Sequence, residues 1–165
     1  MAHVHVHWLD SNVLMEAHRK YYSFDIAPGF WSSIAREAHN GVVRSPLSVL
    51  GEILEGTEKD QLKIWAKGKG KELFVVSGKD EQEAVGEISA YVIATYSQHQ
   101  AAFFLSKADP WVISHALVGN GIVVTQEAPV GPDSTKVKIP NVCKQFKVKC
   151  INTYDLLRTL KIVLQ

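Results

Sequence analysis

The chain has 165 residues, which is enough for one domain with a hydrophobic core, and we expect a single domain over residues 1–165. Apolar residues make up 46% and charged residues 21%, a composition that excludes a disordered chain. No apolar run is long enough to span a bilayer, and the first residues lack the pattern of a secretory signal. The two cysteines, Cys143 and Cys150, exclude a disulfide framework and lack zinc-ribbon spacing. We therefore expect a reduced, cytoplasmic protein with no membrane segment.

Charge is unevenly distributed along the chain. From residue 136 to the end there are seven basic residues against one acid, so the rest of a chain with overall charge +1 carries −5. The seven are Lys136, Lys138, Lys144, Lys147, Lys149, Arg158 and Lys161. A chain whose C-terminal part is basic and whose remainder is acidic suits a protein that binds a polyanion near clustered carboxylates. A solvated lysine face remains equally open on charge alone.

Apolar patterning in the first part of the chain predicts strands that alternate with helices. The predicted strands cover residues 3–9, 42–45 and 73–76, and the predicted helices cover residues 11–22, 31–40, 47–56 and 60–67. Pro28 lies near the start of the second helix, and Pro46 opens the third. The first strand places His3, His5 and His7 on one face, where they either chelate a transition metal or simply extend into solvent.

The same pattern continues in the second part. The predicted helices cover residues 81–100, 109–119 and 153–164, and the predicted strands cover residues 122–125 and 149–152. Strands that alternate with helices of about a dozen residues imply an α/β fold with a parallel sheet covered on both faces. Such folds place their active sites at the carboxyl ends of the strands.

Four acidic residues lie where that rule would place a site. They are Asp10 directly after the first strand, Glu52 in the helix after the second, Asp109 at the start of a later helix, and Glu127 just past residues 122–125. Carboxylates gathered in one cleft repel one another unless a cation lies between them. Carboxylate oxygens suit Mg²⁺ or Mn²⁺. The alternative is a set of helix caps, as Asp109 before Pro110 could be.

The segments around these acids resemble the four acidic motifs of PIN domains. They read LDSNVLMEA, SPLSVLGEILEG, KADPWVISHAL and GIVVTQE, in the family's order and spacing. APGFW and VVTQE are similar to the segments of a PIN-like branch with PGFW and VTxE motifs. The resemblance runs from the first strand to the last helix, and it implies a three-layer α/β/α fold with a central parallel sheet.

The resemblance also implies roles for particular residues. Asp10, Glu52 and Asp109 match the family's acids, and Asn12 and Thr125 match its supporting polar residues. The fourth acid departs from the family pattern, because Glu127 stands where an aspartate is usual, and Glu55 competes with Glu52 for the second position. PIN domains are ribonucleases that use Mg²⁺ or Mn²⁺, and many are VapC-type toxins of type II toxin–antitoxin pairs. The resemblance thus implies a catalytic site of four carboxylates that hold the metal ion and hydrolyse RNA.

Substrate and partner predictions follow. Lys136 and Lys138 are candidates to contact the RNA backbone. Aromatic residues of the first helices either stack on unpaired bases or form core: Tyr21, Tyr22, Phe24, Phe30 and Trp31. A toxin requires an antitoxin, normally with a DNA-binding helix-turn-helix part, and we expect an apolar groove for it lined by Leu14, Tyr21, Phe24, Phe30 and Trp31. A homodimer, or a PIN-like module that binds RNA or protein without cutting, remains the alternative.

Overall fold

Residues 4–165, the part that the computed structural model describes, form one five-stranded parallel sheet with helices on both sides. The strands are β1 (His7–Leu9), β2 (Val43–Pro46), β3 (Phe74–Val75), β4 (Ile122–Val124) and β5 (Lys149–Ile151). Their order is β3-β2-β1-β4-β5, and all pairs are parallel. Because β1 lies in the centre, Trp8 pairs with Arg44 on one side and Val123 on the other. This confirms the predicted parallel sheet.

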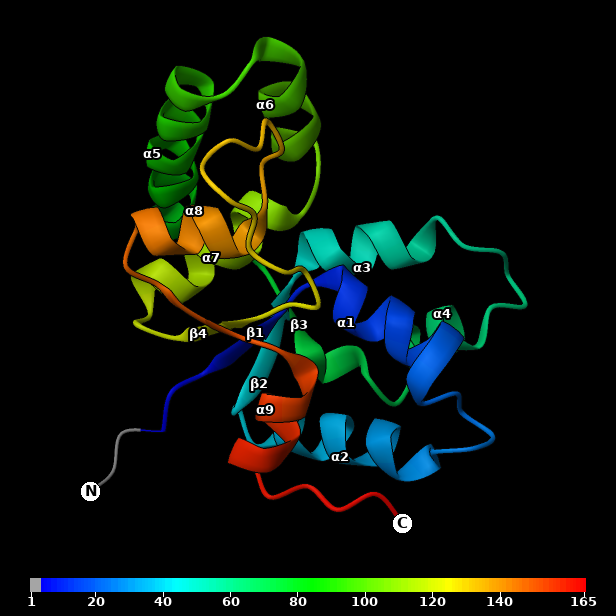
Figure 1. Ribbon diagram of the computed structural model, residues 1–165. Coiled ribbons are helices and arrows are strands. Elements are labelled where there is room, and N and C mark those ends of the chain that lie inside the picture. The colour runs from blue at the N-terminus through cyan, green and yellow to red at the C-terminus, as the bar shows by residue number, and fades with distance from the viewer. Residues whose placement is uncertain (1–3) are drawn as a thin grey trace.

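The helices form two layers around the sheet. In chain order they are α1 (Ser11–Glu16), the π-helical turn η1 (Ala17–Tyr21), α2 (Pro28–His39), α3 (Leu47–Leu54), α4 (Gln61–Lys67), the 3-10 turn η2 (Lys71–Leu73), α5 (Lys79–Thr95), α6 (Gln98–Leu105), α7 (Asp109–Val118), α8 (Ile139–Gln145) and α9 (Thr153–Thr159). In Figure 1, α5 to α8 lie above the sheet, and α2 and α9 lie below it. α7 packs directly on β1, β2 and β4. The arrangement is the predicted three-layer α/β/α fold.

The predicted elements differ from the structure in several places. Within the described residues, the first strand covers only His7–Leu9, and the first helix ends at Glu16 and continues as the turn η1. The helix predicted over residues 81–100 is broken at Tyr96, and α6 starts anew because the Ser97 hydroxyl accepts a hydrogen bond from the Gln100 N–H. The predicted last helix ends at Thr159 and does not continue to residue 164. α8 was not predicted, although Pro140 stands in its first turn, a favoured place for proline.

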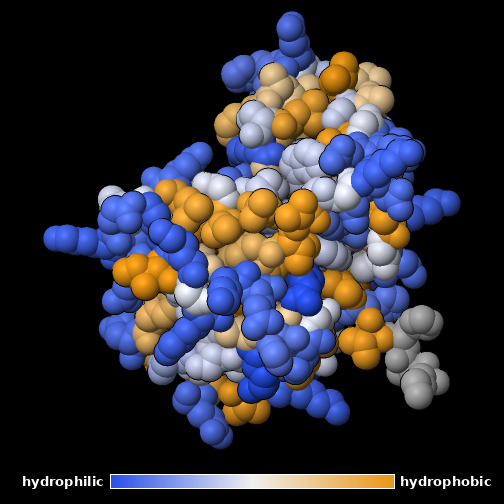
Figure 2. Space-filling view, turned by 180° about the vertical axis from the view of Figure 1, so that it is seen from behind, coloured by the Kyte–Doolittle hydropathy of each residue, from blue (hydrophilic) through white to orange (hydrophobic). Residues whose placement is uncertain are grey.

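The aromatic residues of the first helices mostly form core. Leu14, Phe30 and Trp31 are fully buried, and the Trp31 ring stacks on Phe24 at 4.1 Å between centroids. The predicted partner groove is therefore wrong at these residues, which pack beneath the loop between η1 and α2. Figure 2 shows instead that the apolar side chains of the opposite face gather in a band across its middle. Among the helices of residues 4–165, none is long and apolar enough to cross a membrane.

Gly121, just before β4, lies close to the chain around β1 and leaves no room for a side chain. A methyl group on Gly121 would meet the Val6 carbonyl oxygen at 2.6 Å and the Trp8 ring at 2.9 Å. We therefore expect Gly121→Ala to lower the free energy of unfolding by about 1–3 kcal/mol in urea denaturation. Gly131→Ala is the matched control, since nothing lies within 4 Å of its added methyl group. Equal stability of the two variants would contradict this packing.

Candidate functional site

The candidate site lies at the carboxyl ends of β1 and β4, where the chain places Asp10 and Thr125 side by side. Leu9 pairs with Val124, so the residue after each strand emerges at the same edge of the sheet. The Thr125 hydroxyl donates a hydrogen bond to Asp10 Oδ2 at 3.1 Å. Asp10 is only 1% exposed. The parallel register thus brings a buried carboxylate and its hydroxyl donor together.

Glu52 reaches the same edge from α3, the helix that follows β2. Its Oε2 accepts a hydrogen bond of 2.6 Å from the Ser11 hydroxyl, and its Oε1 accepts one of 2.6 Å from the Ala108 N–H. Ser11 Oγ also lies 3.4 Å from Asp10 Oδ1. Ser11 therefore connects the two carboxylates, and both oxygens of Glu52 are held by donors.

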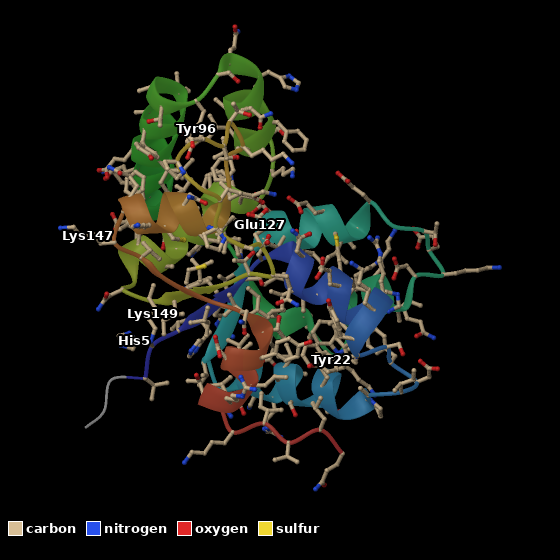
Figure 3. All side chains as sticks on the ribbon, in the orientation of Figure 1. His5, Tyr22, Tyr96, Glu127, Lys147 and Lys149 are labelled. Carbon is tan, nitrogen blue, oxygen red and sulfur yellow. The ribbon has the colours of Figure 1, made fainter. Side chains whose placement is uncertain are left out.

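Asp109 and Glu127 complete the group. Asp109 begins α7 and is only 6% exposed, with Pro110 in the first turn of the helix. Glu127 is half-buried, and its Oε2 accepts a hydrogen bond of 2.8 Å from the Ile139 N–H at the start of α8. Figure 3 marks Glu127 near the middle of the molecule, on the loop that follows β4. The structure thus brings together all four acids that the sequence singled out.

The electrostatics of this group are unfavourable. Burial raises the pKa of Asp10 to about 7, with a further contribution from the charge of Glu127. Burial likewise raises the pKa of Asp109 to about 8, with contributions first from Asp10 and then from Glu127. Within residues 4–165, no lysine, arginine or histidine forms an ion pair with any of the four acids. The cluster holds like charges without a basic partner.

These residues fit a small divalent cation in part. In the described chain, no group of three or more His, Cys, Asp or Glu side chains stands ready to hold a metal ion. Hydrogen-bond donors already contact both oxygens of Glu52 and one of Glu127. Asp10 and Asp109 are buried and form no ion pair within residues 4–165, although the charge of Lys107 acts to lower the pKa of Asp109. Mg²⁺ is commonly held by one or two carboxylates together with water and phosphate oxygens, so this pair suits it.

A cavity of about 310 Å³ opens beside the acids. Asp109 and Glu127 line it together with three lysines, Lys107, Lys136 and Lys138, and with uncharged side chains that include Phe103. Lys136 and Lys138, which the sequence suggested as RNA contacts, thus line the same cavity as two of the acids. A cavity lined by both carboxylates and lysines suits a phosphate chain bound next to a metal ion.

Other expected residues lie elsewhere or make no contact at the site. Asn12 is half-buried on α1, and its side chain forms no hydrogen bond within residues 4–165. Glu55 is exposed after the end of α3 and does not replace Glu52. His3 lies outside the described residues, while His5 is exposed and His7 is buried.

Three partners of the acids were missed by sequence reasoning. Ser11 had no predicted role at the site, but its hydroxyl donates a hydrogen bond to Glu52. The Ala108 N–H and the Ile139 N–H are backbone donors, for which residue identity carries no signal. Thr125 was predicted as a supporting residue, and its hydroxyl does donate to Asp10.

Fold and site together define a three-layer α/β/α protein with carboxylates clustered at the ends of its central strands. The family described as a domain of unknown function (DUF4411) matches residues 7–164, and the chain belongs to this family. No curated protein matches the chain in sequence. Among solved structures, it is similar to a chain of VapBC2 from Rickettsia felis bound to a DNA fragment from their promoter. The two share 17% identity over 89% of this chain and 98% of that chain, with a TM-score of 0.54, a likeness that shows the fold.

The raised pKa values predict how stability depends on pH. An aspartate in the unfolded chain has a pKa near 3.8, whereas Asp10 and Asp109 keep their protons to about pH 7 and 8 when folded. Between these pKa values the folded protein binds more protons than the unfolded chain. The contribution of this pair to the free energy of unfolding therefore falls as the pH rises from about 4 to about 8. Without divalent metal, we expect Asp109→Asn to be more stable than the wild type at pH 8 by about 2 kcal/mol, and to lose this advantage by pH 4.

Urea denaturation at several pH values with a chelator present measures this difference. Glu87→Gln is the control, because Glu87 is exposed on α5, away from the site. The buried histidines, His7 and His115, are present in all three proteins, so their contribution to the pH dependence of stability cancels when the proteins are compared. Parallel pH profiles for the wild type and Asp109→Asn would contradict the repulsion described here.

Proposed function

We propose that the protein is a metal-dependent endoribonuclease that hydrolyses RNA phosphodiester bonds. The observation that carries the proposal is the pair of buried carboxylates, Asp10 and Asp109, which form no ion pair within residues 4–165, and of which Asp109 borders a cavity lined by lysines. Asp10 and Asp109 would hold the ion, with Glu52 and Glu127 beside them. The chemistry that bound Mg²⁺ or Mn²⁺ supplies is polarisation of the scissile phosphate and activation of a water molecule.

The chain's own residues would position the reactants. The Thr125 hydroxyl orients Asp10, and the Ser11 hydroxyl and Ala108 N–H fix Glu52. In the same cavity, Lys136 and Lys138 would bind the phosphates of the RNA backbone. Phe103, 58% exposed at the cavity, offers a ring on which an unpaired base would stack. Asn12 stays a candidate for contact with a metal-bound water or with the substrate.

Substitution of Asp109 tests the nuclease proposal. With an unstructured RNA and Mg²⁺ or Mn²⁺, we expect Asp109→Asn to cut at least about 100-fold more slowly than the wild type, because one of two unpaired ligands is neutralised. Glu87→Gln should cut at the wild-type rate, and a chelator should stop all cutting. Denaturation curves establish that both variants are folded.

A second candidate function is a PIN-like module that binds RNA or protein without cutting. It is favoured by the hydrogen bonds that occupy Glu52 and Glu127, and by the lack of a ready group of three metal-holding side chains in residues 4–165. Wild-type protein that binds RNA yet leaves it intact with either metal would establish this alternative and exclude the nuclease.

We further propose that the nuclease is the toxin of a type II toxin–antitoxin pair in the cytoplasm. The likeness to a chain of VapBC2, a structure that holds a promoter DNA fragment, supports an antitoxin partner that binds DNA. The apolar band in Figure 2 is a surface that a protein partner or a second copy of the chain would cover.

Expression in growing cells tests the toxin proposal. We expect the wild type alone to arrest growth and Asp109→Asn to be harmless, because toxicity requires cleavage. Co-expression with the neighbouring gene product should restore growth, and the two proteins should purify together. A harmless wild type without a co-purifying partner would exclude the toxin assignment while leaving the nuclease open.

A further inference from the structure

The two cysteines lie against each other beside the acidic site. Cys143 is on α8 and is fully buried, and Cys150 is on β5 and is half-buried. The two thiols lie close enough for each to shift the pKa of the other. The chain reverses between them at Lys147, whose φ is +56°, and the Val148 N–H binds the Cys143 carbonyl oxygen at 2.8 Å. This turn packs α8 against β5 and brings the two cysteines together.

Only one of the two thiols is accessible. Cys150 lines an open groove of about 710 Å³ along the edge of β4 and β5, whose walls include Thr125 and Glu127. Cys143 is not among the lining residues of this groove. A small reagent that enters the groove therefore meets Cys150 first, with Cys143 directly behind it.

We propose that Cys150 and Cys143 form an oxidisable pair, in which a hydroperoxide reacts at Cys150 and the product is a Cys143–Cys150 disulfide. In the first step, the Cys150 sulfur attacks one peroxide oxygen, the O–O bond breaks, and Cys150 becomes a sulfenic acid while water leaves. In the second step, the Cys143 sulfur attacks the Cys150 sulfur and a second water leaves with the Cys143 proton. Two thiols are oxidised and one hydrogen peroxide is reduced to two waters.

Accessibility sets this order of events, because Cys150 borders the groove and Cys143 does not. The pKa of Cys150 is lowered by its interaction with Cys143, although burial and the charges of Asp10 and Glu127 act in the opposite direction. The interaction with Cys150, together with burial, raises the pKa of Cys143. The inference does not depend on the proposed nuclease activity.

Oxidation of the purified, reduced full-length chain tests the proposal. With hydrogen peroxide in slight excess, we expect the intact mass to fall by about 2 Da and both free thiols to disappear. Peptide mapping should place the crosslink between residues 143 and 150. The melting temperature should rise by about 5 °C, because the crosslink constrains the unfolded chain, and a dithiol reductant should reverse the change.

Two variants test the assigned roles. Cys143→Ala, which keeps an apolar side chain at the buried position, should gain about 16 Da and then about 32 Da at Cys150, since no second thiol resolves the sulfenic acid. In Cys150→Ser, the buried Cys143 should remain unoxidised under the same conditions. Circular dichroism establishes that both variants are folded.

Several results would overturn the proposal. An unchanged wild-type mass, a wild type that gains oxygen at Cys150 without a crosslink, or a disulfide between two chains would each exclude the intramolecular pair. Equal oxidation rates in the two variants would exclude the assignment of Cys150 as the reacting thiol. The wild-type mass and peptide map decide the first point even if a variant fails to fold.

Discussion

Repulsion among buried carboxylates at one edge of the sheet is the constraint on which the rest of the site depends. Asp10 and Asp109 are almost completely buried, and burial raises both of their pKa values. Donors or a cation can offset the charge of such groups, and otherwise they take up a proton. The donors to the cluster come from three separate parts of the chain: the Thr125 hydroxyl donates to Asp10, and the Ser11 hydroxyl and the Ala108 N–H donate to Glu52. The parallel sheet makes this possible, because its strands end together and bring these segments to one edge.

The sequence predicts best those strands and helices whose local residue pattern favours the same structure as their packing in the folded chain. The short apolar run at β4 and the Asp109-Pro110 start of α7 are unambiguous signals, and both appear where expected. The helix predicted over residues 81–100 is too long because the apolar spacing continues past Ser97. In the structure α5 ends at Thr95, and Ser97 caps the start of a separate helix, α6. α8 is only seven residues long, too short for periodicity to reveal it.

The four acids of the candidate site and one of their partners, Thr125, could be predicted from the sequence, whereas the other partners could not. Asp10, Glu52, Asp109 and Glu127 could be placed from strand ends and motif order, because side-chain chemistry and spacing are written in the sequence. Backbone donors such as the Ala108 N–H depend on where α7 begins relative to α3, which only the folded chain determines. The partner groove predicted at Phe30 and Trp31 is wrong for a related reason. Both side chains pack inward, and composition alone does not separate core residues from surface residues.

The hydrogen bonds divide the acids into two kinds, and this division bears on the proposed chemistry. Glu52 and Glu127 are oriented by N–H and O–H donors, which offset part of their charge. Asp109 has no such donor in residues 4–165, and Asp10 accepts longer hydrogen bonds of 3.1 Å from the Thr125 hydroxyl and 3.4 Å from the Ser11 hydroxyl, together with the Ser11 backbone N–H. A cation that approached the cluster would therefore gain most from Asp10 and Asp109. In the proposed nuclease, the two glutamates build the wall of the site and the two aspartates hold the ion. This is why Asp109, rather than Glu52, is the decisive position for both the stability and the cleavage experiments.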